Sequence, residues 1–80
     1  DGSEECLMLE TPEYIYVAVF NYTHQEKSDD IPFEVLGTST DCISEIKELW
    51  SDTIVTPIGQ SLSYTIPATD AKIFRLTKIK

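Results

Sequence analysis

Eighty residues, 41% hydrophobic and 25% charged, have the size and composition of a single folded domain, which excludes a disordered segment. Fourteen acidic residues against six basic ones give a net charge of -8, so electrostatics oppose nucleic acid and anionic membranes as partners. No apolar run approaches the roughly 20 residues of a membrane-spanning helix. The only methionine is Met8, so we expect a processed chain or part of a longer protein.

The longest apolar stretch, residues 14–22 (YIYVAVFNY), predicts the central strand of a sheet. It contains neither a charge nor a glycine, and its aromatic and β-branched residues favour a strand over a helix. Alternation places Val17 and Val19 on one side and Tyr14 and Tyr16 on the other. Both sides are apolar, so we expect one side to face a second layer and the other to meet more protein.

Turn signals divide the rest of the chain into short runs, a spacing typical of a sandwich or barrel. Residues 23–30 (THQEKSDD) predict a polar surface connection. Residues 41–50 fit a helix in isolation, but the spacing of their neighbours favours a strand. The sequence therefore predicts an all-β fold, an antiparallel two-sheet β-sandwich of about seven strands, Greek-key-like. The expected strands are 5–10, 14–22, 31–36, 41–50, a brief piece at 54–55, 61–66 and 71–78.

Nothing in the sequence predicts a catalytic, metal or cofactor site. The acidic residues are scattered through turns, and His24 lies in a polar loop without a metal-binding or nucleophile motif around it. Cys6 and Cys42 lack the CxxC spacing of a redox or metal site. They could be bridged, but we favour two buried thiols. Asn21 opens a glycosylation sequon, although we favour a role for its side chain in holding the turn.

The aromatic residues are the best candidates for contact with another molecule. Tyr64 alternates with apolar neighbours and is expected in the core, and Trp50 is interpreted as a plug that closes the sandwich. Tyr14 and Tyr16 then form an apolar patch outside the core, which is typical of an interface. We expect Tyr14, Tyr16 and, as a weaker candidate, Trp50 to serve domain docking, with contact to carbohydrate as the alternative.

The order of motifs in residues 14–78 resembles one family. The segments IKELWSDTIV and GQSLSYTIPATDAKIFRLTK are similar to the end of the small C-terminal β-domain that follows the catalytic barrel in α-galactosidases of the melibiase type. Glu48 stands where that family usually has Asp. The residues that carry the resemblance are the strand at 16–23, the motif Ile46, Glu48, Leu49 and Trp50, the strand end at Pro67 and the final strand at 73–77.

The resemblance implies a non-catalytic C-terminal module of a glycoside hydrolase, packed on the catalytic barrel of the same chain and stabilising it. It also implies that the catalytic carboxylates lie in the barrel, and that the parent enzyme is secreted or periplasmic. An independent carbohydrate-binding module and an Ig-like interaction domain are the alternatives.

Overall fold

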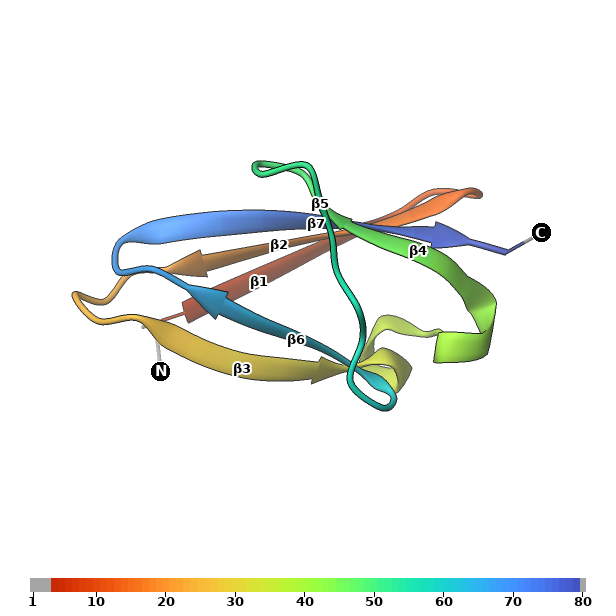
Figure 1. Ribbon diagram of the computed structural model, residues 1–80, viewed down its shortest axis with the longest axis horizontal. Helices are drawn as coiled ribbons and strands as arrows, with labels where there is room; N and C mark the ends of the chain where they lie inside the picture. Colours follow the sequence, from red (N-terminus) through yellow and green to blue (C-terminus); the bar gives the residue numbers. More distant parts are fainter. Residues whose placement is uncertain (1–3, 80) are drawn as a thin grey trace.

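The computed structural model describes residues 4–79 as seven strands in two antiparallel sheets that lie face to face (Figure 1). The larger sheet has the order β1-β2-β7-β4-β5, and the smaller sheet pairs β3 with β6. The predicted two-sheet sandwich of seven strands is therefore confirmed. The elements are β1 (Glu4–Glu10), β2 (Tyr14–Asn21), β3 (Lys27–Pro32), β4 (Ile43–Glu48), β5 (Thr53–Ile54), β6 (Ser61–Ile66) and β7 (Asp70–Lys78), with short 3-10 turns at Phe33–Leu36 and Thr40–Cys42.

Strand β2 has the central place that its composition predicts. It pairs with β1 on one side and β7 on the other, and its alternate residues Ile15, Val17 and Val19 are buried between the sheets. The smaller sheet supplies the opposite wall of the core through β6. Tyr64 is part of that wall, as expected. The buried core consists of Ile15, Val17, Val19, Phe33, Leu36, Ile46, Leu62, Tyr64, Ile66, Phe74 and Leu76.

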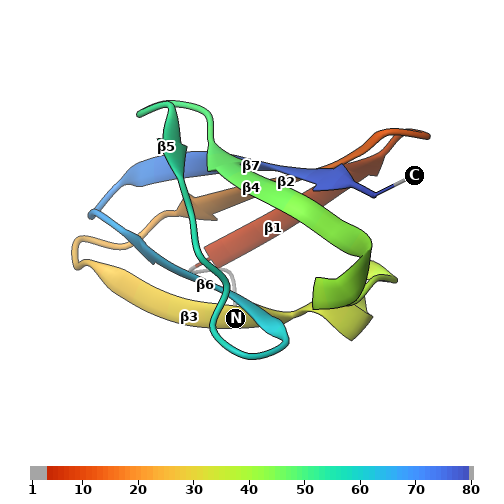
Figure 2. The same ribbon diagram turned by 45° about the vertical axis from the view of Figure 1, so that its right-hand side comes forward.

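The ambiguous segment at residues 41–50 contains a strand, as the spacing of its neighbours predicts. Ile43–Glu48 pairs with β7, and the helical pattern survives only as the 3-10 turn Thr40–Cys42 before it. Strand β7, at the end of the sequence, lies between β2 and β4 and pairs with both, so strands that are distant in sequence are neighbours in one sheet. Figure 2 shows the connection from β5 to β6 running from one sheet to the other.

The predicted strand at residues 31–36 is wrong in its position. The strand is Lys27–Pro32, within much of the expected polar loop, and Phe33–Leu36 forms a 3-10 turn. The polar side chains are tolerated because β3 belongs to a two-stranded sheet whose outer side faces solvent, while its backbone pairs with β6. Gly37 then ends the turn in the left-handed conformation, with φ of 76°, which glycine adopts without strain.

The two cysteines are exposed, so the expectation that they are buried is wrong. No disulfide joins Cys6 to Cys42. Cys6 lies on β1, the edge strand of the larger sheet, where the smaller sheet does not cover the inner side. Met8 on the same strand is half-exposed for the same reason.

Asn21 is 1% exposed and holds the turn, as expected. Its Nδ2 group donates to the carbonyl oxygens of Gln25, Ile66 and Pro67 at 2.8 to 3.1 Å. Its Oδ1 accepts from the amide and the hydroxyl of Thr23. Both ends of the amide are therefore used to join the β2–β3 loop to the end of β6.

Candidate docking surface

The outer face is the side of the five-stranded sheet that the smaller sheet does not cover. Strand register places the outward residues of four strands in rows across it. One row runs from Leu9 through Tyr16 and Arg75 to Lys47. A second row runs from Leu7 through Ala18 to Ile73, whose carbonyl accepts from the amide of Leu49. The apolar and basic residues of the outer face are Leu7, Leu9, Tyr14, Tyr16, Ala18, Phe20, Lys47, Leu49, Ala71, Ile73 and Arg75, and the same register adds Glu5, Glu45 and Thr77.

The middle of the outer face is an apolar depression of about 350 Å³. Ala18 has a much smaller side chain than Leu7 and Ile73, its neighbours in the row, so the surface is hollowed there. Leu7 and Leu9 remain 53% and 63% exposed. A contiguous apolar surface of this kind on a small acidic domain is typical of an interaction site.

Tyr14 and Tyr16 lie on this face and outside the core, where the alternation of β2 places them. Both side chains are half-buried, and their ring centroids are 5.8 Å apart with the planes tilted by 55°. The tilt means that the two rings do not form one flat platform for a sugar. Their suggested role in docking stays a prediction, although their position is compatible with it.

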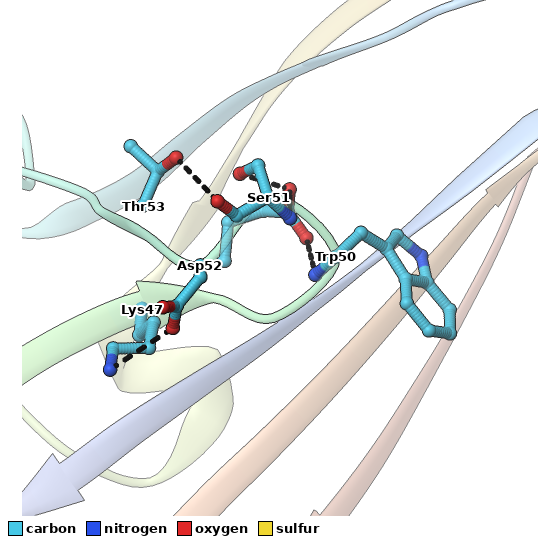
Figure 3. Close-up of polar contacts among 6 residues, drawn as sticks. Lys47, Trp50, Ser51, Asp52 and Thr53 are labelled. Carbon is cyan, nitrogen blue, oxygen red and sulfur yellow. Dashed lines mark hydrogen bonds and ion pairs between the residues drawn. The ribbon is translucent and has the colours of Figure 1, made fainter.

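Trp50 is 66% exposed, so its interpretation as a plug of the sandwich is wrong. Strand β4 ends at Glu48, and the turn that follows breaks the alternation that would have pointed Trp50 inward. Figure 3 shows the indole projecting from this turn, away from Asp52 and Lys47. Among ring pairs of the described residues, none joins Trp50 to Tyr14 or Tyr16.

Glu48 organises the turn that carries Trp50. Its carboxylate is 5% exposed and accepts from the amides of Trp50 at 2.7 Å and Ser51 at 3.1 Å, and from the Ser51 hydroxyl at 2.7 Å. Burial acts to raise the pKa of Glu48, but these hydrogen bonds and the charge of Lys72 outweigh it and hold the pKa below its ordinary value. The carboxylate is therefore ionised and structural.

Arg75 is a residue of the outer face that the sequence did not single out. It is half-buried, and its guanidinium lies over the ring of Tyr14, with Cζ 5.0 Å from the centroid. Its Nε atom is buried without a hydrogen-bond partner among residues 4–79. The alternation of β7 puts Arg75 on the face away from the buried Phe74 and Leu76, and the strand order gives it its neighbours on β2 and β4.

A second aromatic pair lies at the far end of β2. The rings of Phe20 and Tyr22 are stacked, with centroids 6.2 Å apart and planes 7° apart. The Tyr22 hydroxyl donates to Glu5 at 2.8 Å, and this hydrogen bond raises the pKa of Tyr22. Tyr22 is 56% exposed, so its ring is open to solvent, and its plane is nearly parallel to that of Phe20.

The outer side of the smaller sheet is polar and offers less for a sugar. The hydroxyls of Ser28 and Thr65 are 2.8 Å apart, and Ser63 donates to Asp30 at 2.8 Å, so these groups already satisfy each other. Among the described residues that line this surface, Tyr64 alone has an aromatic ring, and that ring is buried in the core.

Residues 4–79 contain no cluster of three or more His, Cys, Asp or Glu side chains that could hold a metal ion. In the same part of the chain, no helix has the length and apolar character to cross a membrane.

Comparison with solved structures gives the same fold in larger enzymes. Alpha-galactosidase I from Mortierella vinacea matches 95% of this chain with a TM-score of 0.77 and 13% identity. A GH27 β-L-arabinopyranosidase from Geobacillus stearothermophilus, solved with arabinose, matches all of it with a TM-score of 0.78 and 12% identity. The chain spans only 21% and 18% of those two enzymes, respectively.

Comparison with curated proteins gives no match. The family described as the alpha galactosidase C-terminal beta sandwich domain matches residues 10–76, which is most of the sequence. The residues that carry the resemblance in the sequence fall almost entirely within this range. The chain therefore belongs to the family of alpha galactosidase C-terminal beta sandwich domains.

Proposed function

We propose that this chain is the non-catalytic accessory part of a larger glycoside hydrolase, and that its outer face packs on the catalytic barrel and stabilises it. The observation that carries the proposal is the apolar outer face, with Leu7 and Leu9 more than half exposed around a depression floored by Ala18. Further support comes from the solved enzymes with this fold, in which the matching domain is about a fifth of a longer chain.

The first test places a charge on the outer face of the longer protein. Leu9→Asp should lower its unfolding midpoint by about 5 °C or more, because a carboxylate without a partner would be buried between the two domains. In the 80-residue chain alone the same change should cost less than about 1 kcal/mol, because Leu9 is exposed there. Thermal unfolding of both proteins measures the difference.

Ile58→Asp is the matched control, because Ile58 is 70% exposed and lies away from the five-stranded sheet. It should leave both midpoints nearly unchanged. Equal effects of Leu9→Asp on the longer protein and on the 80-residue chain would contradict docking through the outer face.

The second candidate function is binding of carbohydrate, which the stacked pair Phe20 and Tyr22 favours. We expect docking instead, so the chemical shifts of the 80-residue chain should not move when galactosides or arabinosides are added. Saturable shifts centred on Phe20 and Tyr22 would favour a carbohydrate-binding module.

A further inference from the structure

Arg75 places a positive charge on the outer face, beside Tyr16, which lines the apolar depression. In the strand register it lies between Tyr16 of β2 and Lys47 of β4, with Leu9 one strand further on. Its guanidinium covers the ring of Tyr14. A charged side chain surrounded by apolar neighbours loses part of its hydration, and this loss is compensated only when the charge meets a partner.

The hydrogen bonding of Arg75 is incomplete within the described chain. Nε is covered by neighbouring atoms and has no acceptor. Buried polar atoms almost always have a partner, so an unpaired one calls for an explanation. The neighbouring cation Lys47 already has a carboxylate partner, with its Nζ 3.3 Å from Oδ1 of Asp52, whereas Nε of Arg75 has none among the described residues.

We infer that the surface packed against the outer face presents a carboxylate to Arg75. This inference rests on the proposed function, and its occupant is the catalytic part of the same longer chain. Arginine binds a carboxylate through two parallel N–H donors, and such pairs are among the strongest polar contacts at interfaces. Arg75 is half-buried, so part of its side chain remains open to a surface that packs on the outer face.

The charge of the domain supports this choice of occupant. The chain carries -8 overall, so most of its surface repels an acidic partner. The two rows in the middle of the outer face contain the cations Lys47 and Arg75, whereas the carboxylates of this face, Glu5 and Glu45, lie in the rows on either side of them. An acidic group on a docking partner is therefore accepted at this place in preference to the rest of the domain.

The test compares Arg75→Met in two proteins. Methionine keeps much of the length and apolar contact of the arginine stem but removes the charge and its donors. In the 80-residue chain we expect an unchanged or higher unfolding midpoint, because the unpaired Nε is removed. In the longer protein we expect the midpoint to fall by about 5 °C, because the partner's carboxylate is left buried without its cation.

Two further variants separate this inference from the proposed function. Arg75→Lys keeps the charge but not the two parallel N–H donors. In the longer protein its unfolding midpoint should therefore lie between those of the wild type and Arg75→Met. Lys27→Gln removes one positive charge from the smaller sheet and should change neither midpoint. If Leu9→Asp destabilises the longer protein and Arg75→Met does not, docking stands and the carboxylate is refuted. If neither variant destabilises the longer protein, both the docking proposal and the carboxylate inference are refuted.

Discussion

At the scale of single residues, Glu48 is the side chain whose role is most specific. It is an almost completely buried carboxylate that accepts three hydrogen bonds from the turn at Trp50 and Ser51. Glutamine has one acceptor oxygen and an NH₂ group that would face these donors. The shape of the turn after β4 therefore depends on both carboxylate oxygens of Glu48.

We predict that Glu48→Gln lowers the free energy of unfolding by about 1–2 kcal/mol at pH 7, since hydrogen bonds to a charged group are lost. The pKa of Glu48 is lower in the folded state than its ordinary value of 4.5, so the contribution is complete above that value and is lost as the pH falls through the lowered pKa. Urea unfolding at pH 7 and at pH 3 should show the two proteins converging in acid.

Glu26→Gln is a control for this comparison, because Glu26 is an exposed glutamate on a loop. Its effect at pH 7 should stay within about 0.5 kcal/mol. A difference between wild type and Glu48→Gln that is as large at pH 3 as at pH 7 would show that the charge of Glu48 does not stabilise the turn.

At the scale of elements, β2 carries buried core residues on one side and residues of the outer face on the other. Val17 is buried between the sheets, while its neighbour Tyr16 lies on the outer face. We predict that Val17→Ala costs the 80-residue chain about 2 kcal/mol, because it leaves a cavity in the core. Tyr16→Ser should cost about 1 kcal/mol or less, since no void opens in the core. Chemical denaturation measures both.

If Tyr16→Ser destabilises the 80-residue chain as much as Val17→Ala does, the outer face is part of the core rather than a surface. Tyr14→Ser extends the comparison to the second tyrosine of this face. The larger loss of both tyrosine variants should appear in the longer protein, where docking buries the rings.

Much of this element-level order could be predicted from the sequence. Alternation gave the two sides of β2 and the span of β6, and the spacing of the neighbouring turns gave the strand in residues 41–50. It misplaced β3, because a strand paired on a solvent-exposed sheet can be polar and still satisfy its backbone. The surroundings of Trp50 and Arg75 could not be predicted, because they depend on a turn held by Glu48 and on strands that are distant in sequence.

At the scale of the whole molecule, β7 holds the larger sheet together. It lies between β2 and β4 and contributes Phe74 and Leu76 to the core. We predict that a chain ending after Ile66 does not fold, because β2 and β4 would each lose a neighbour and the core its wall. A chain ending after Lys78 keeps every strand and should unfold cooperatively. Circular dichroism during heating distinguishes the two.

The strand order also determines how the domain would bear a pulling force. β1 and β7 run in the same direction on either side of β2, so the start of β1 and the end of β7 lie at opposite ends of the sheet (Figure 1). Tension applied at these two points acts along the strands, in shear. The backbone hydrogen bonds of both ladders must then break together, so the domain would resist stretching better than one that is unzipped pair by pair.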